Sequence, residues 1–237
     1  MVRGGLIDLV FPPVCAGCGL PGTLLCERCA ADVPLIDQHS ACQHCGAARD
    51  DAARACPECS GRTFAFTQAR CASALEPPVS RAVVMLKDGG ERRYAELLAT
   101  FLAECAAGWL TEADTLVPVP ASPEALRRRG FDHAADVARA LGRVTGLPVR
   151  RLLVSSASSD QRVLGRDERF ANRLGAFRAN PNVVRSGVRM PDSVVLVDDV
   201  FTTGATMHAA AQALSAAGVR SVRALAVARA CNPRSDG

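Results

Sequence analysis

The chain has 237 residues, of which 49% are hydrophobic and 22% charged, and its formal net charge is +4. This composition is ordinary for a globular protein and predicts an ample core, in one large domain or in one domain with a small module. No stretch approaches the about 20 apolar residues of a membrane span, and the N-terminal stretch lacks the features of a signal peptide. We therefore expect a cytoplasmic protein whose eleven cysteines are reduced.

Four CxxC pairs follow a short lead that ends at Pro12-Pro13. They are Cys15/Cys18, Cys26/Cys29, Cys42/Cys45 and Cys56/Cys59. One CxxC pair presents two thiolates to a tetrahedral ion, so four pairs supply two closed four-cysteine zinc sites. A disulfide scaffold and redox-active CxxC pairs are the alternatives, but no βαβ pattern surrounds these cysteines, which favours zinc. We predict two structural zinc ions.

The pairing of these zinc ligands stays open. Sequential pairing leaves loops of seven and ten residues inside the two sites, and a crossed arrangement is the alternative. His39 and His44 lie nearby, but the cysteines already suffice as ligands. A closed zinc site has no open coordination position, and this segment is not notably basic. We therefore expect a folding or docking module here, rather than a nucleic-acid-binding ribbon.

The rest of the chain alternates between expected strands and expected helices, read from short β-branched runs and from apolar residues three and four apart. The strands are expected within 62–80 and at 115–120, 149–154, 176–178, 194–197 and 222–228. The helices are expected at 94–110, 131–144, 161–174 and 205–217, and a loop at 181–192. This alternation predicts an α/β fold with a parallel, doubly wound sheet, whose ligands bind at the carboxyl ends of the strands.

One stretch, residues 194–206, joins a buried strand to a helix through acidic and small residues and reads VVLVDDVFTTGAT. Asp198 and Asp199 follow the apolar run, and their carboxylates can accept hydrogen bonds from a diol. The threonine and glycine loop behind them opens a helix, whose N–H groups and dipole favour a phosphate. A helix cap would explain the acidic pair alone, but not the TTGAT that follows it. The stretch therefore indicates a sugar-phosphate site.

VVLVDDVFTTGAT resembles the phosphoribosyl pyrophosphate (PRPP) binding motif of type I phosphoribosyltransferases. A wider resemblance, to the ComF family (ComFC/GntX-like), rests on FPPVCAGCG, the CxxC pairs, LVPVPAS, RRRGFDHA and QRVLGRDERFANRLGAF in that order. That family joins a double zinc ribbon to a phosphoribosyltransferase-like domain, and its members are linked to DNA uptake in natural transformation. The resemblance implies a double zinc ribbon at 1–62, a connecting strand at 63–80 and the phosphoribosyltransferase-like domain at 81–237.

The resemblance also implies roles for individual residues. Asp198 and Asp199 would hold the ribose hydroxyls, and magnesium would bridge pyrophosphate and ribose oxygens while keeping several waters. The residues that would wrap the 5′-phosphate are Thr202, Thr203, Gly204, Ala205 and Thr206. The residues of the pyrophosphate loop would be Pro120, Ala121 and Ser122.

Arg129 and Arg166 are candidates for anion contact, because a guanidinium binds phosphate with two parallel hydrogen bonds. Residues 161–174 correspond to a mobile hood over the site in related enzymes, and a solvated, salt-bridged helix is the alternative. Lys87 is the only lysine in the chain, so the many arginines indicate a compositional bias. A solvated role is therefore the default for most of them.

The chain departs from the family's pattern at two places. Asp132-His133 stands where the family has Asn-Gln; His133 is either an acid or base or an exposed residue at a helix N-terminus, and Asp132 is a candidate N-cap. Thr202 stands where purine-salvage enzymes have a carboxylate base. The sequence thus assigns no base, and the catalytic residues stay unknown, with Asp198 and Asp199 as candidates.

Three functions follow. The first is a magnesium-dependent phosphoribosyltransferase, transferring a pentosyl group from PRPP to an unknown acceptor. The second is a non-catalytic PRPP-binding competence protein that holds single-stranded DNA or a DNA-uptake helicase or DNA-processing partner. The third is a sensor of PRPP or nucleotides that docks through its zinc module. Single-strand binding needs aromatic residues beside basic ones, and this chain has few such places.

Overall fold

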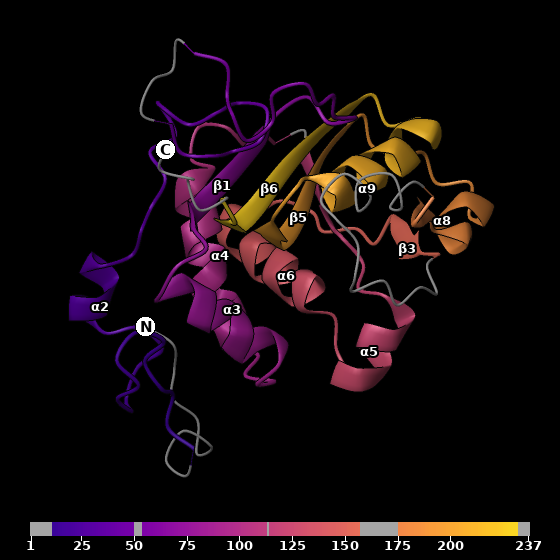
Figure 1. The fold of residues 1–237 in the computed structure, drawn as a ribbon. Coiled ribbons are helices and arrows are strands. Elements are labelled where there is room, and N and C mark those ends of the chain that lie inside the picture. Colours follow the sequence, from indigo (N-terminus) through magenta and orange to yellow (C-terminus); the bar gives the residue numbers. More distant parts are fainter. Residues whose placement is uncertain (1–10, 50–53, 113, 157–174, 232–237) are drawn as a thin grey trace.

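The structure is a computed structural model that describes residues 11–49, 54–112, 114–156 and 175–231. A four-stranded parallel sheet lies at its centre (Figure 1). Across the sheet the order is β1 (Ala69–Ala74), β6 (Ser221–Arg229), β5 (Ser193–Phe201) and β2 (Asp114–Pro118). The predicted parallel, doubly wound architecture is confirmed. β1 falls within the expected connecting segment 63–80, and it forms one edge of this sheet by pairing with β6.

Both faces of the sheet are covered. Successive residues of a strand point to opposite faces, so one strand contributes side chains to the core on each side. Val195 and Val197 of β5 pack into one core cluster, and Val194 and Leu196 pack into another. The helices of the first cluster are α3 (Val79–Lys87), α4 (Tyr94–Cys105) and α6 (His133–Thr145). Helix α9 (Ala205–Ala216) and the second cysteine-rich segment cover the other face. Two-sided burial explains the unbroken apolar run at the start of β5.

Several smaller elements lie outside the central sheet. The expected strand 149–154 is shorter than predicted: β3 (Leu153–Ser155) pairs in antiparallel fashion with β4 (Phe177–Ala179), and Val149 makes only one bridge to Leu116 of β2. The expected loop 181–192 begins with α8 (Pro181–Arg185), which the side chain of Asn180 caps. The remaining helices are α2 (Glu27–Ala31) and α5 (Pro123–Arg129). None of the helices in the described part of the chain has the length and apolar character that crossing a membrane requires.

The two cysteine-rich segments dock at different places. In the first, the Gly17 carbonyl accepts a 2.7 Å hydrogen bond from Arg81 of α3, and the Val14 carbonyl accepts one from the Tyr94 hydroxyl of α4. In Figure 1, α2 of this segment lies on the α3 side of the molecule. The second segment runs beside β1, where the amide of Ala69 donates to the Gln43 carbonyl at 2.8 Å. Each segment is therefore held against a different part of the sheet domain.

Candidate functional site

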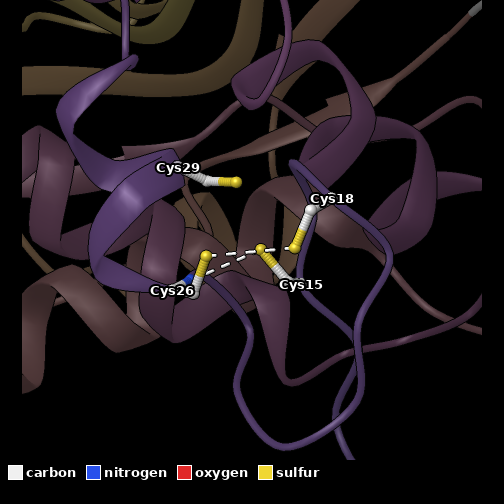
Figure 2. A group of neighbouring side chains, drawn as sticks. All are labelled: Cys15, Cys18, Cys26 and Cys29. Carbon is white, nitrogen blue, oxygen red and sulfur yellow. Dashed lines mark hydrogen bonds between the residues drawn. The ribbon is translucent and has the colours of Figure 1, made fainter.

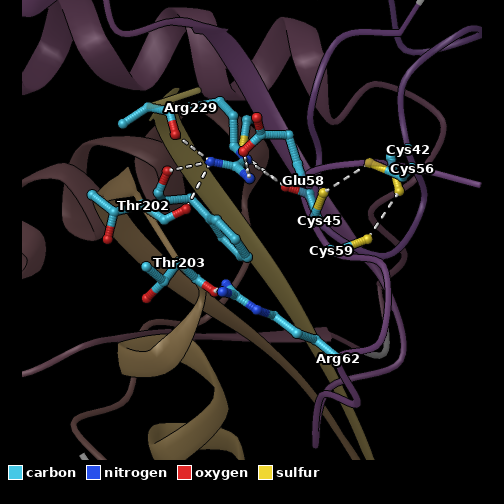
Figure 3. A network of polar contacts seen from close by, with 12 residues as sticks. Cys42, Cys45, Cys56, Glu58, Cys59, Arg62, Thr202, Thr203 and Arg229 are labelled. Atoms are coloured by element: carbon cyan, nitrogen blue, oxygen red, sulfur yellow. Dashed lines mark hydrogen bonds and ion pairs between the residues drawn. The ribbon is translucent and has the colours of Figure 1, made fainter. Parts of the chain in front are cut away.

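The eight CxxC cysteines form two clusters, and the pairing is sequential. In each cluster, the four Sγ atoms lie within 4.8 Å of one another. In the second, Cys42 Sγ lies 3.7 Å from Cys59 Sγ and Cys45 Sγ lies 3.8 Å from Cys56 Sγ (Figure 3). Sulfurs around a tetrahedral zinc stand about 3.8 Å apart, because each Zn–S bond is about 2.3 Å. A disulfide would bring them to about 2.05 Å. The spacing fits zinc, and the prediction of two four-cysteine zinc sites is confirmed.

The first cluster has the same arrangement (Figure 2). It joins Cys15 and Cys18 to Cys26 and Cys29, with 3.9 Å between the sulfurs of Cys18 and Cys26. Among the described residues, no histidine belongs to either cysteine cluster. Neither cluster leaves a place for a reacting ligand, so both sites are structural.

The two adjacent carboxylates lie inside a strand rather than after it. β5 continues to Phe201, because Asp198 pairs with Ala226 and Val200 with Ala228 of β6. Asp198 is 9% exposed and Asp199 is 3% exposed. Asp198 Oδ1 accepts a hydrogen bond from the amide of Asp199 at 2.9 Å. The carboxylates therefore stand at the carboxyl edge of the sheet, largely shielded from solvent.

A lysine and a histidine from two different helices reach Asp199. Lys87 Nζ, at the end of α3, lies 2.7 Å from Asp199 Oδ2, and His133 Nε2, at the start of α6, lies 3.5 Å from the same atom. His133 is 6% exposed, so the alternative of an exposed histidine is wrong. The side chain of Asp132 caps α6 by accepting from the Ala135 amide at 3.2 Å, and this cap turns the next residue inward. His133 Nδ1 is buried and has no hydrogen-bond partner in the described part of the chain.

The two carboxyl groups have opposite pKa shifts. Burial, followed by the charge of Asp199, raises the pKa of Asp198 to about 7. Burial also acts to raise the pKa of Asp199, but the hydrogen bond from His133 and the charge of Lys87 outweigh it and hold this pKa well below its ordinary value. Asp199 is therefore ionised at neutral pH, whereas Asp198 keeps its proton to a higher pH than an ordinary carboxyl does.

The loop between β5 and α9 has a conformation that only glycine can complete. Gly204 has a φ of +80° and precedes the first residue of α9. A Cβ on Gly204 would lie 2.7 Å from ring atoms of Phe201 and Phe64. Thr203 Oγ1 accepts from the Ala205 amide at 3.3 Å, which sets the start of the helix. Thr202 remains exposed at the tip of the loop.

The segment after β2 begins next to this edge of the sheet. Pro118 pairs with Val197, and the Val119 amide donates to the Val197 carbonyl at 2.9 Å. The residues that follow, 120–122, therefore start beside the carboxylate pair. Ser122 Oγ accepts from the Ala125 amide at 3.1 Å and caps α5. The Ser122 hydroxyl thus has a structural partner already, and the Ser122 carbonyl accepts from the Leu126 amide at 2.9 Å.

The arginine candidates have different positions. Arg129 Nη2 donates to Asp88 Oδ1 at 3.2 Å, and the Arg129 side chain is 12% exposed. Its Nε is buried and unpaired within the described residues. Arg166 and the expected hood 161–174 lie outside the described residues. The Asp88–Arg129 pair fastens the end of α3 to α5, next to the ion pair of Lys87 with Asp199.

Sequence reasoning missed two residues at this site. Lys87 stands out in the sequence only as the single lysine, although its place at a helix end before a glycine turn would let it reach a neighbouring element. Arg229 interrupts the apolar strand β6 and is 1% exposed, which an arginine inside the run ALAVARA could have signalled.

Two protein families match separate parts of the chain. Residues 6–60 match the double zinc ribbon domain family, and residues 125–235 match the phosphoribosyl transferase domain family. The matched segments contain both cysteine clusters and the whole stretch from the carboxylate pair to α9.

Curated relatives have names that refer to competence and to DNA utilization. Competence protein ComFC of Streptococcus pneumoniae (strain ATCC BAA-255 / R6) is 29% identical over 143 residues, which cover 60% of each chain. The alignment therefore spans less than two thirds of that relative's length. DNA utilization protein YhgH of Salmonella typhi is 28% identical over 233 residues, covering 93% of this chain and 99% of the relative.

Among solved structures, that of the allosteric regulatory enzyme of purine biosynthesis contains a similar chain. It aligns with a TM-score of 0.34 at 21% identity and covers 56% of this chain and 25% of that one. At that TM-score the similarity supports no inference about function. The fold rests instead on the strand order and on the match to the phosphoribosyl transferase domain family.

Proposed function

Because the chain belongs to the ComF family, with a double zinc ribbon and a phosphoribosyltransferase-like domain, we propose that it binds PRPP with magnesium at the carboxyl edge of its sheet. The observation that carries the proposal is the buried pair Asp198 and Asp199, directly ahead of a glycine loop and the N-terminus of α9. Diol recognition and phosphate recognition thus lie within nine residues of chain, 198–206.

In the proposed complex, each half of the site meets a different part of PRPP. Asp198 and Asp199 accept hydrogen bonds from the ribose 2′- and 3′-hydroxyls. The 5′-phosphate lies against 202–206, where the backbone N–H groups and dipole of α9 favour an anion. The pyrophosphate lies against Pro120, Ala121 and Ser122, with Arg129 as a further anion contact. Arg166 belongs to the proposal only through the family motif, as part of a hood over the ligand.

Magnesium fits the donor set of this edge. Ligand atoms of His133, Asp198 and Asp199 lie within 4.8 Å of one another. Magnesium prefers oxygen ligands and keeps several waters, so the two carboxylates suit it better than the imidazole does. The ion would neutralise the pyrophosphate and thereby favour its departure. Its positive charge would also favour ionisation of Asp198.

As an enzyme, the protein would transfer the phosphoribosyl group of PRPP to an acceptor and release pyrophosphate. Asp198 and Asp199 are the catalytic candidates, through charge stabilisation at the ribose. Thr202 cannot serve as a carboxylate base, so the acceptor would have to be a nucleophile that needs no such base, or would need one from elsewhere. The cysteine-ligated zinc sites suit the reducing cytoplasm.

A second candidate function is PRPP binding without catalysis in a competence protein that also holds single-stranded DNA or a DNA-processing partner. The names of the relatives, which refer to competence and DNA utilization, favour it. Arg127 and Arg128 are exposed in the last turn of α5 and would be the candidates for contact with a nucleic acid backbone.

Calorimetry with PRPP and magnesium tests the binding proposal. The double variant Asp198→Asn/Asp199→Asn should abolish binding, whereas Asp192→Asn should bind as the unaltered protein does. Asp192 is a matched control because it lies just before the other end of β5, is 52% exposed and pairs with Arg220. Unchanged affinity in the double variant would refute the site.

A pyrophosphate-release screen separates the two functions. The unaltered protein is incubated with PRPP, magnesium and a panel of bases, amines and single-stranded DNA. Release with one acceptor that disappears in the double variant supports the transferase. Tight PRPP binding with no release from any acceptor supports the non-catalytic protein.

A further inference from the structure

One buried side chain, Arg229, touches both the second cysteine cluster and the candidate phosphate loop (Figure 3). Arg229 is the last residue of β6 and is 1% exposed. Its guanidinium carbon lies 5.0 Å from the centre of the Phe201 ring. A buried guanidinium is costly unless its N–H groups have acceptors, so its partners identify what it holds in place.

Part of the guanidinium fixes the loop. Arg229 Nη1 donates to the Thr202 carbonyl at 2.7 Å and to the Phe201 carbonyl at 3.3 Å. The same nitrogen also donates to the carbonyl of Ala230. The carbonyls of Phe201 and Thr202 belong to the two peptide units that lead from β5 into the loop. Arg229 therefore helps to set the direction in which 202–204 leave the strand.

The rest of the guanidinium holds the second cysteine cluster. Arg229 Nε donates to the carbonyl of Cys45 at 3.0 Å, and Nη2 lies 3.3 Å from Glu58 Oε2. Cys45 belongs to one CxxC pair of the cluster, and Glu58 lies inside the other, between Cys56 and Cys59. Both halves of the zinc site are thus tied to the cation that orients the loop.

The chain that leaves the second cluster strengthens this link. Arg62 Nη1 donates to the Thr203 carbonyl at 3.5 Å, and the ring of Phe64 meets that of Phe201 edge-on with 6.2 Å between centroids. The Ala65 amide donates to His208 Nδ1, in α9, at 3.0 Å. The first cluster docks on α3 and α4 instead, and none of the described contacts joins its cysteines to the loop.

From this arrangement we propose that Arg229 is a positioning residue that couples zinc at the second cluster to the conformation of the phosphate loop 202–206. Zinc holds the two CxxC pairs together, and with them the Cys45 carbonyl and the Glu58 carboxylate. Loss of this zinc frees both acceptors, so Arg229 no longer has a fixed position from which to hold Thr202. Loss of zinc from the first cluster leaves these contacts intact. The consequence for ligand binding rests on the proposed function, whereas the coupling itself does not.

Matched variants of the full chain separate the two clusters. Cys56→Ser removes the third ligand of the second cluster, and Cys26→Ser removes the third ligand of the first. Arg229→Gln removes the cation and leaves all eight zinc ligands, and Arg229→Lys retains a charged donor. For each variant, the measurements are zinc content, hydrogen–deuterium exchange of the amides at 202–206, and calorimetry with PRPP and magnesium. Amides of the β5 core report any global unfolding.

We expect both Cys56→Ser and Arg229→Gln to speed amide exchange in the loop by about tenfold or more, and to weaken PRPP binding by a similar factor. The reason is that each change leaves the buried carbonyls of Phe201 and Thr202 without the Arg229 donor. The Cys26→Ser variant should lose the zinc of the first cluster, and its loop exchange and PRPP affinity should each change by less than about twofold. Arg229→Gln should keep both zinc ions, and Arg229→Lys should recover part of the loop protection. By reciprocity, PRPP should slow the chelator-driven loss of zinc from the second cluster and not from the first.

Equal effects of Cys56→Ser and Cys26→Ser on the loop, or unchanged loop exchange in Arg229→Gln, would overturn the coupling. If Arg229→Gln unfolds globally, the comparison of the two cysteine variants decides alone. If the unaltered protein binds no PRPP while loop exchange responds as expected, the proposed function fails and the coupling stands. If PRPP binds all variants with equal affinity and loop exchange is also the same in all of them, the function stands and the coupling fails.

Discussion

The adjacent carboxylates of β5 should affect stability in opposite directions when each is replaced by asparagine. Asp198 is largely buried beside a second carboxylate, and its pKa is raised to about 7. Between the ordinary carboxyl pKa, near 4, and pH 7, the folded state keeps a proton that the unfolded state gives up. The contribution of Asp198 to stability is therefore fully present below about pH 4 and is lost as the pH rises through 7.

The magnitude follows from the size of the shift. A shift of about three pKa units corresponds to at most about 4 kcal/mol, and relaxation of the site reduces this to about 1–3 kcal/mol. Asparagine keeps the oxygen that accepts from the Asp199 amide and carries no charge. At pH 8 and without ligand, Asp198→Asn should therefore raise the melting temperature by several degrees, at about 2–4 °C per kcal/mol for a chain of this size. At pH 5 the difference should fall to about a third of its value at pH 8, because only about one of the roughly three pH units between the two pKa values has then been passed.

Asp199→Asn should have the opposite sign. It leaves Lys87, whose side chain is 28% exposed, without its partner at 2.7 Å. The pKa of Asp199 is lowered in the fold, so its stabilising effect is present above pH 4 and is lost only as the pH falls through the folded pKa. We expect a loss of about 1–3 kcal/mol at neutral pH, because partial exposure weakens the cost of an unpaired charge.

Thermal unfolding of both variants at pH 5, 6, 7 and 8, without magnesium or PRPP, measures these effects. Asp192→Asn, at the exposed end of the strand, controls for the general effect of removing a carboxylate. If Asp198→Asn is destabilised at pH 8, or if both variants shift in the same direction at every pH, burial does not control the ionisation of Asp198. The assignment of the two carboxylates to different protonation states would then be wrong.

Three further predictions concern other parts of the molecule. Metal analysis of the purified chain should give two zinc ions, and a result of one ion, or none with oxidised thiols, contradicts the double ribbon. Gly204→Ala should lower the free energy of unfolding by about 2 kcal/mol or more in denaturant titrations, because φ is +80° and the new methyl would meet Phe201 and Phe64. Lys87→Met should weaken PRPP binding in calorimetry, since Asp199 loses the cation that holds it. The double variant Lys87→Met/Asp199→Asn should bind PRPP no more weakly than Asp199→Asn alone.

The elements that could be predicted are those with a local signal. The buried run at 194–197 and the helix behind Gly204 appear where the pattern places them, because β-branched residues and a glycine before a helix act within a few residues of chain. The end of the strand could not be predicted. β5 runs on through Asp198 and Asp199 because β6 offers hydrogen-bond partners as far as Arg229, and those partners come from a distant part of the sequence.

In the candidate site, too, some features have a local sequence signal and others depend on tertiary packing. Its carboxylates and its threonine–glycine loop are contiguous and readable in VVLVDDVFTTGAT. His133 is ambiguous in the sequence because a histidine after an N-cap can face solvent or core, and only the packing of α6 on the sheet decides which. Lys87 reaches Asp199 through the packing of α3 on the same face, which periodicity along one helix does not reveal.

By itself, the sequence determined the ligands of both zinc sites and the alternation of strands and helices, and it supplied the prediction of a sugar-phosphate site at 194–206. These features depend on spacing and side-chain type within short segments. The tertiary structure alone decided the sequential pairing of the cysteines, the opposite pKa shifts of Asp198 and Asp199, and the place of Arg229 between zinc and loop. The physical reason is that burial and electrostatic contact arise from the order β1-β6-β5-β2 and from what packs on each face, which no local pattern encodes.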